Sequence, residues 1–277
     1  MGDYLSPKET AEAYDSISVN KAKNSLSNLF ILGILAGVYI AFAGFASQTI
    51  SYTIDNPGLA KFAGGAVFPV GLILVVIAGA ELFTGNNLMI IGVMDKRISF
   101  NELFRNWITV YTANFIGSVL FAYLVSRSGL FDSAHGLLGA TVIKAAVGKI
   151  SLPFSQALIR GILCNIMVVL AVWMATAAKD IISKLFAIWF PIMLFVMSGF
   201  EHSIANMYYI PAGIFAKSNT LYLKAGKIEA ASISQLNIGG FFANLIPVTL
   251  GNIIGGAIVI GLAYWYVYRY TSVKKVS

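Results

Sequence analysis

Three ionisable side chains, Glu81, Glu201 and His202, lie in the middle of long apolar runs. Ionisable residues inside a membrane span are costly to bury and are functional candidates by default. The two glutamates belong to near copies of one stretch, 79–87 (GAELFTGNN) and 199–206 (GFEHSIAN). Because small and polar residues follow each glutamate, we expect both stretches to interrupt a helix and to flank a pore.

His202 occupies the position in the second stretch that Leu82 has in the first. Desolvation favours the neutral imidazole, whereas an approaching anion favours the protonated ring. One site could therefore attract an anion and pass it a proton, and a weak acid crosses hydrocarbon more cheaply when neutral. Thr84 adds a hydroxyl, and each restarted helix should offer free backbone N–H groups to an anion. The alternative is a core histidine that bonds a neighbour.

The remaining polar residues have two interpretations each. Glu81 and Glu201 are expected to be structural, either accepting hydrogen bonds from loose backbone at the breaks or tying helices together, because a carboxylate repels anions. Asn165 and Asn252 lie inside predicted spans and could bond across helices to the broken segments or to the histidine. Lys149 is either a solvated loop lysine or an anion collector at a pore mouth.

The composition indicates an integral membrane protein. Of the 277 residues, 58% are hydrophobic and 11% are charged, whereas about a quarter of the residues in a soluble domain are charged. The net charge of +7 would suggest nucleic acid in a soluble protein, but here the basic residues lie mostly in loops and tails. A single cysteine and two histidines exclude an internal disulfide and make a metal centre implausible. We therefore expect no metal, no cofactor and no enzymatic activity.

The apolar runs predict an all-α protein with six transmembrane segments. The runs at 64–94 and 185–216 are too long for one helix of about 20 residues and too short for two helices with a loop. We therefore expect each to be a helix broken at its glutamate. The predicted spans are 26–54, 64–94, 106–126, 161–178, 185–216 and 236–268. Polar links are expected at 127–160 and 217–229, and residues 1–25 are either a solvated tail or a helix that caps the pore.

The two halves of the chain match. Gly33 corresponds to Gly161, Glu81 to Glu201, and Asn114 to Asn252, in the same order. Because each half has three spans, the second half must enter the membrane from the opposite side, as a 3+3 inverted repeat. We expect a segment at 1–25, one transmembrane domain at 26–270 with repeats at 26–127 and 152–270, and a tail at 271–277. Basic residues slightly favour cytoplasmic termini in a bacterial-type inner membrane.

These motifs resemble the formate/nitrite transporter family. The resemblance covers about residues 26–270, and its signatures are 78–85 (AGAELFTG), 161–168 (GILCNIMV), 198–207 (SGFEHSIANM) and 246–256 (IPVTLGNIIGG). It implies an aquaporin-like protomer with broken second and fifth helices, assembled as a homopentamer in the lipid bilayer. The implied substrates are formate, nitrite or hydrosulfide, with protons as a possible partner.

The resemblance also implies roles for individual residues. His202 is the central pore histidine, and Thr84 is its polar partner across the pore. The other implied pore residues are Phe68 and Phe195 in an outer constriction, Leu72 and Leu82 in an inner one, Asn165 and Asn252 along the chamber, and Lys149 near the outer vestibule. Nothing in these residues separates the three anions, and the overall likeness favours the hydrosulfide branch. The alternatives are an aquaporin-like channel for neutral solutes, whose paired Asn-Pro-Ala motifs are absent, and a membrane enzyme.

Overall fold

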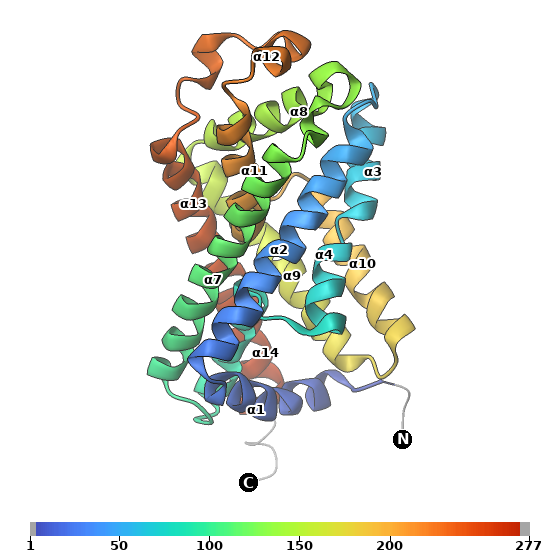
Figure 1. Ribbon diagram of the computed structural model, residues 1–277. Coiled ribbons are helices and arrows are strands. Elements are labelled where there is room, and N and C mark those ends of the chain that lie inside the picture. The colour runs from blue at the N-terminus through green and yellow to red at the C-terminus, as the bar shows by residue number, and fades with distance from the viewer. Residues whose placement is uncertain (1–3, 272–277) are drawn as a thin grey trace.

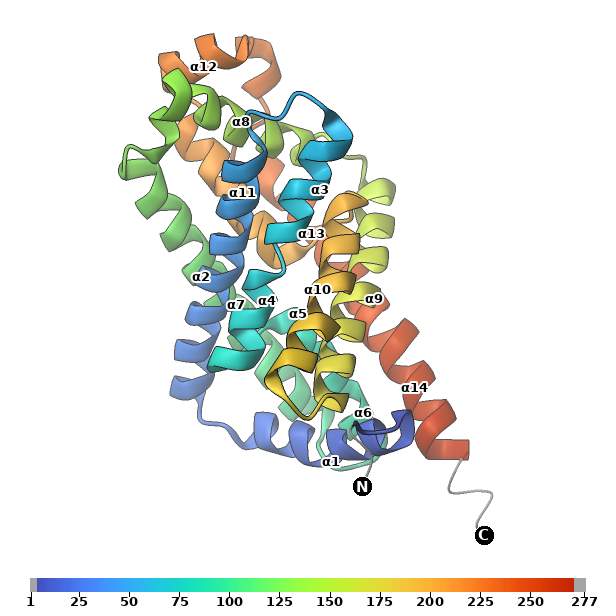
Figure 2. The same ribbon diagram turned by 90° about the vertical axis from the view of Figure 1, so that its right-hand side faces the viewer.

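The computed structural model describes residues 4–271 of the chain and consists of helices, apart from an isolated antiparallel bridge between Tyr4 and Ala178. The long helices form a bundle, with α1 lying across one end and α8 and α12 gathered at the other (Figure 1). The view in Figure 2 shows the same two ends. The first half contains α1 (Pro7–Lys23), α2 (Leu26–Ser51), α3 (Pro57–Val67), α4 (Val70–Ile73), η1 (Leu74–Gly79), α5 (Phe83–Asn86), η2 (Asn87–Met89), α6 (Ile90–Met94) and α7 (Phe100–Arg127). The second half contains η3 (Leu130–Asp132), α8 (Ser133–Ile150), α9 (Phe154–Ala177), α10 (Ile181–Met197), α11 (Ser203–Ala216), α12 (Thr220–Gly226), η4 (Ala230–Ile233), α13 (Ile238–Ile253), η5 (Ile254–Leu262), α14 (Ala263–Trp265) and η6 (Tyr266–Tyr270).

Within residues 4–271, five helical segments are long and apolar enough to cross a membrane, by length and composition. They are Leu26–Ser51, Pro57–Gly79, Phe100–Arg127, Phe154–Ala177 and Ile238–Tyr270. Shorter apolar helices cover Phe83–Met94 and Ile181–Met197. A multi-pass membrane protein, as the composition indicates, accounts for these segments, since each spanning helix satisfies its own backbone hydrogen bonds.

Two helix pairs cross at very short distance, α2 with α7 and α9 with α13. A Cβ atom at Gly37 in α2 would collide with the backbone of Asn114 in α7, and one at Gly251 in α13 would collide with the backbone of Leu158 in α9. Small residues allow such close packing between membrane helices. The close approach brings polar side chains of α7 and α13 within reach of the broken segments.

The prediction of a polar link over 127–160 is wrong, because this stretch contains α8. Lys144 and Lys149 suggested a loop, although an amphipathic helix keeps its charged and apolar residues on different faces. α9 begins at Phe154, so the span predicted at 161–178 starts before Arg160, which the sequence left open. The apolar stripe that α8 buries consists of Leu138, Val142, Ile143 and Ala146.

Of the predicted segment 1–25, the described residues 4–25 are not a solvated tail, because α1 packs against the bundle. A capping box starts the helix: the Glu9 N–H donates to Ser6 Oγ, and the Ser6 N–H donates to the Glu9 carboxylate. Asp15 forms ion pairs with Arg97 and Arg269, at 3.0 and 2.9 Å. These contacts hold α1 across the end of the bundle. Its buried face consists of Thr10, Ala11, Tyr14, Ser18 and Ala22.

Candidate functional site

Each half of the chain holds a helix that stops and restarts inside the bundle. η1 ends at Gly79, whose φ is 89°, and the chain turns at Gly199 after α10, where φ is 73°. Glycine enters this left-handed region without the steric cost that a Cβ imposes. Extended residues follow, and the helices restart as α5 at Phe83 and as α11 at Ser203.

Both helix ends are closed in the same way. The Ala80 N–H donates to the Val75 carbonyl at 2.9 Å, and the Phe200 N–H donates to the Phe195 carbonyl at 3.1 Å. Such a bond across a left-handed glycine satisfies a carbonyl that the helix end would otherwise leave unpaired. The Gly-x-Glu pattern therefore begins with the residue that ends the helix.

An asparagine holds the extended segment of the first break. Asn114 in α7 donates to the carbonyls of Gly33 and Glu81, at 2.7 and 2.9 Å, and its Oδ1 accepts the Phe83 N–H at 3.0 Å. One buried amide thus joins α2, the break and the restarted helix.

Asn252 makes the same three bonds in the second half. It donates to the carbonyls of Gly161 and Glu201, at 2.8 and 3.0 Å, and accepts the Ser203 N–H at 2.9 Å. It does not bond the histidine. The expectation that the first amides of the restarted helices are free for an anion is wrong at Phe83 and Ser203, because asparagine oxygens occupy both.

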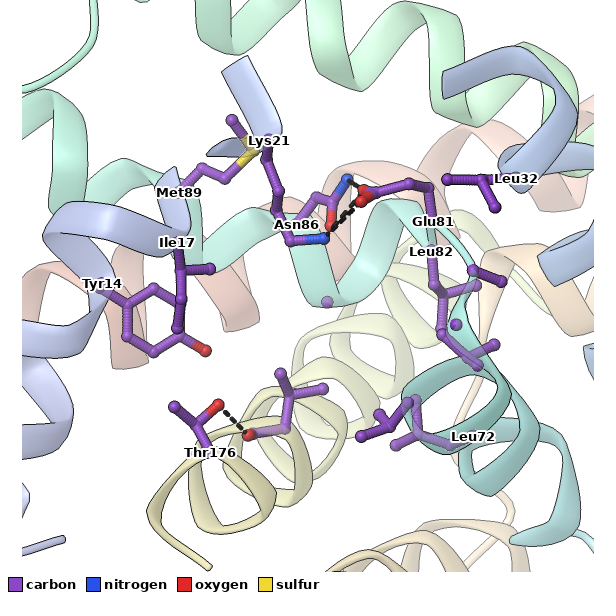
Figure 3. A pocket seen from close by; sticks show the side chains of 16 residues that line it. Tyr14, Ile17, Lys21, Leu32, Leu72, Glu81, Leu82, Asn86, Met89 and Thr176 are labelled. Carbon is purple, nitrogen blue, oxygen red and sulfur yellow. Dashed lines mark hydrogen bonds and ion pairs between the residues drawn. The ribbon is translucent and has the colours of Figure 1, made fainter. Parts of the chain in front are cut away.

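The first glutamate lies in a cluster of four polar side chains. Lys21 Nζ is 2.8 and 2.9 Å from the two Glu81 carboxylate oxygens. Asn86 Nδ2 donates to Glu81 Oε2 at 2.7 Å and to Asn106 Oδ1 at 2.8 Å. Figure 3 shows Lys21 and Asn86 converging on Glu81. The carboxylate therefore ties α1 to the break and to α5.

The second glutamate has the matching cluster. Lys149 Nζ is 3.0 and 3.2 Å from the Glu201 oxygens. Asn206 Nδ2 donates to Glu201 Oε2 at 2.6 Å and to Asn244 Oδ1 at 2.7 Å. Lys149 is thus neither in a loop nor solvated, since its side chain is 17% exposed and ion-paired.

Lys21 and the first cluster are not predicted from the sequence motifs. Lys21 precedes Gly33 at the same spacing at which Lys149 precedes Gly161. This spacing was the available signal, and it shows that α1 corresponds to α8, as α2 does to α9.

His202 and Thr84 meet where the two breaks face each other. His202 Nε2 is 3.0 Å from Thr84 Oγ1, and both side chains are buried. The Ala205 N–H donates to His202 Nδ1 at 3.1 Å. Because Nδ1 accepts this bond, the proton of the neutral ring lies on Nε2, which donates to the threonine hydroxyl.

Asn165 braces the same region from α9. Its Nδ2 lies 3.3 and 2.7 Å from the carbonyls of Thr84 and Asn252 and 2.8 Å from Asn87 Oδ1, so three acceptors share its two N–H groups. It is fully buried and contacts the backbone of the restarted helix, not the histidine. Asn165 therefore holds the backbone of Thr84 in place from the α9 side.

Three cavities lie in series along this region. The α1 vestibule, of about 370 Å³, is lined by Tyr14, Lys21, Leu72, Glu81, Leu82 and Thr176, among others (Figure 3). The α8 vestibule, of about 260 Å³, is lined by Gln48, Phe68, Lys149, Phe195, Glu201 and His202, among others. Between them, a central chamber of about 10 Å³ is lined by Ile40, Phe68, Leu72, Leu82, Val168, Ile192, Phe195 and His202.

Two apolar pairs separate the chamber from the vestibules. Leu72 and Leu82 border both the chamber and the α1 vestibule. Phe68 and Phe195 border both the chamber and the α8 vestibule, with ring centroids 5.6 Å apart. A cavity of about 10–15 Å³ is the smallest that holds one water molecule. An anion can pass only if these side chains move.

This arrangement can be compared with known proteins. A family model described as formate/nitrite transporter matches residues 8–266. The chain belongs to the formate/nitrite transporter family. The resemblance seen in the sequence is thereby confirmed, and the chain is a transport protein of the class that carries small monovalent anions.

Several members of the formate/nitrite transporter family match over nearly their whole length. A probable formate transporter of Methanothermobacter thermautotrophicus is 44% identical, over 96% of this chain and 97% of the relative. The formate channel FocA of Escherichia coli is 40% identical, over 96% of this chain and 95% of the relative.

Solved structures of this family also match. A pentameric formate channel with formate bound superposes with a TM-score of 0.79 at 36% identity, over 88% of this chain and 97% of that chain. A structure described as an FNT family ion channel has a TM-score of 0.80 at 29% identity, over 93% and 98% of the two chains. The all-helical fold is therefore that of the family's channels.

Proposed function

We propose that this chain is a channel for formate and related small monovalent anions, with His202 and Thr84 as the polar contact midway through the pore. One observation carries the proposal: His202, whose Nε2 is 3.0 Å from Thr84 Oγ1, lines a small chamber bordered on both sides by apolar side chains. The relatives described as formate channels support formate as the substrate.

The chemistry follows from desolvation. An anion that leaves a vestibule for an apolar constriction loses its water, which is costly unless other donors replace it. His202 borders both the α8 vestibule and the chamber, and its Nε2–H becomes such a donor when it turns from the Thr84 hydroxyl to the anion. A neutral histidine can therefore stabilise a passing anion without holding it as tightly as a fixed positive charge would.

Proton transfer is a separate step and stays a prediction. To give a proton to formate and remain neutral, the ring must first carry protons on both nitrogens. A proton on Nδ1 would displace the Ala205 N–H, which now donates there at 3.1 Å. Proton co-movement through His202 therefore requires the ring to turn or the first turn of α11 to open.

In this proposal the chain crosses the membrane six times as a 3+3 inverted repeat, with breaks in the second and fifth crossings. The matched Lys21 and Lys149 clusters support repeat units that begin at α1 and α8, earlier than the predicted 26 and 152. The α1 end faces the cytoplasm of a bacterial-type inner membrane. Of the predicted tail at 271–277, residues 272–277 lie outside the described residues.

The assembly and the pore residues belong to the same proposal. A solved relative described as pentameric supports a homopentamer with one pore in each protomer. Phe68 and Phe195 form the outer constriction, and Leu72 and Leu82 the inner one. Asn165 and Asn252 brace the chamber, Glu81 and Glu201 anchor the breaks, and Lys149 lies at the α8 vestibule.

Flux into proteoliposomes tests the proposal. Formate, nitrite and hydrosulfide are supplied in competition, and the internal pH is recorded. We expect formate to be carried and to compete with the other two; preferential hydrosulfide flux would establish the hydrosulfide branch that the sequence favours. An equal pH change with and without the anion would exclude proton co-movement. Water or glycerol flux without anion flux would identify a neutral-solute channel and overturn the proposal.

A further inference from the structure

The α8 vestibule contains a buried amide group that lacks a partner. Gln48 in α2 is 5% exposed and lines this vestibule together with Lys149 and Phe68. Its Oε1 accepts a hydrogen bond from the Tyr208 hydroxyl at 2.9 Å. Its Nε2 group makes no hydrogen bond to any residue between 4 and 271. Buried amide donors are almost always paired with protein, water or a ligand, so this one calls for an occupant.

The α1 vestibule shows that this donor is not a consequence of the repeat. The residue of α9 that matches Gln48 is Thr176, which lines the α1 vestibule. Its hydroxyl donates to the Val172 carbonyl at 2.8 Å, within its own helix (Figure 3). The unpaired amide donor of Gln48 therefore has no counterpart at the matching position of the α1 vestibule.

Neither the charges around Gln48 nor the size of the cavity prevents an anion from binding there. The nearest carboxylate on this wall, Glu201, is ion-paired with Lys149 and bonded by Asn206. The Lys149 ammonium also lies 5.0 Å from the Tyr209 ring centroid, and both residues line the vestibule. A cavity of about 260 Å³ holds several water volumes of about 30 Å³. A small anion with part of its hydration shell fits there.

We propose that Gln48 Nε2 and the Lys149 ammonium form a vestibule subsite that binds a carboxylate, one oxygen to each group, before the anion passes Phe68 and Phe195. This inference rests on the proposed function and deepens it. A carboxylate offers two oxygen acceptors in a fixed fork, whereas hydrosulfide offers a single atom. The subsite therefore favours carboxylates over hydrosulfide at the α8 side.

The test uses full-length protein in membrane vesicles of both orientations, which present each vestibule in turn to the outer solution. Gln48→Met removes the NH₂ group at nearly constant size, and Gln48→Glu removes it while keeping the acceptor for Tyr208. With formate supplied at the α8 side, the half-saturating concentration rises about tenfold in either variant, the effect of losing one hydrogen bond to a charged group. The maximal rate stays unchanged, and the value for hydrosulfide changes less than twofold.

Thr176→Val is the matched control, because it changes the corresponding position of the α1 vestibule. It leaves half-saturation from the α8 side unchanged. The inference is overturned if formate half-saturation in Gln48→Met stays within twofold of the wild type in both orientations, or if formate and hydrosulfide shift equally. A wild-type protein that carries no formate overturns both this inference and the proposed function; an unaffected Gln48→Met protein that carries formate overturns the subsite alone.

Discussion

The two broken helices share their scaffold and differ at the residue that starts the second part. Gly79 and Gly199 end the first part in the same left-handed turn, and a lysine-paired glutamate follows in each. Then Leu82 brings an alkyl side chain to the inner constriction, whereas His202 caps α11 and meets the threonine. The comparison teaches that the repeated residues position the breaks and that the departures from the repeat supply the chemistry.

The largest expected effect comes from making the second break like the first. His202→Leu removes the Nε2–H donor from the chamber and the cap from α11, so formate flux should fall about 100-fold. Proteoliposome uptake measures this. Leu82→Met is the control and should retain most of the flux. His202→Asn keeps a side-chain oxygen for the Ala205 N–H, and wild-type flux and pH dependence in this variant would remove the imidazole from the mechanism.

The two ion pairs should differ in stability in the order of their burial. Glu201→Gln leaves Lys149 without a counter-ion at 17% exposure and should cost about 3 kcal/mol, whereas Glu81→Gln leaves the 27% exposed Lys21 and should cost about 2 kcal/mol. Thermal unfolding in detergent measures both. Adding Lys149→Met to Glu201→Gln should recover most of the loss. Equal losses in the two single variants would contradict the ranking.

Alanine substitutions of the two glycines at the breaks, Gly79 and Gly199, should destabilise the protein equally. A Cβ at Gly79 or Gly199 would meet no atom within 4 Å, so an alanine pays only for its positive φ. Gly79→Ala and Gly199→Ala should each cost about 1–2 kcal/mol of unfolding free energy. A difference greater than about 1 kcal/mol between the two variants would show that the breaks are not equivalent in backbone terms.

The smallest effect concerns the two helices that carry the lysines. α1 begins with the capping box of Ser6 and Glu9, whereas α8 starts with left-handed backbone at 134–136, and Asp132 before it makes no side-chain capping bond. Hydrogen bonds from Ser6 lower the pKa of the Glu9 carboxyl. A lowered pKa in the folded state stabilises α1 above the ordinary carboxyl value near 4.5, and this contribution is lost as the pH falls through the lowered value.

Hydrogen exchange measures that contribution. Amides in the first turn of α1 should exchange faster, after correction for the intrinsic rate, as the pH falls from 6 to 3. Glu9→Gln should remove most of this pH dependence. The first helical turn of α8 after Gly136 should show none from this source, and an unchanged profile in Glu9→Gln would exclude the capping box as its origin.

Much of the fold and site could be predicted from the sequence. The lone carboxylates in over-long apolar runs located both breaks, because a charge in such a run is too costly to be accidental. The match of Asn114 with Asn252 also identified residues that make identical hydrogen bonds. The family resemblance supplied the pore residues. Most of them line the three connected cavities, whereas Thr84, Asn165 and Asn252 do not. Their roles in transport stay predictions.

The features that could not be predicted from the sequence depend on side-chain packing, which the hydropathy of the residues does not reveal. α8 was taken for a loop because its lysines outweighed its small apolar stripe. Lys21 lies in a polar N-terminal segment, which is typical of solvated chain. Its ion pair with Glu81, a residue far along the sequence, becomes apparent only in the structure. Gln48 gave no signal at all, since an amide within a span reveals an unpaired donor only when its surroundings are known.

The small central chamber has a consequence for the membrane as an insulator. Protons cross water-filled pores by hopping along unbroken files of hydrogen-bonded molecules. A chamber of about 10 Å³ between two apolar constrictions has space for at most one such molecule. In this conformation the file of water molecules is interrupted, so the closed pore does not conduct protons down their gradient across the membrane.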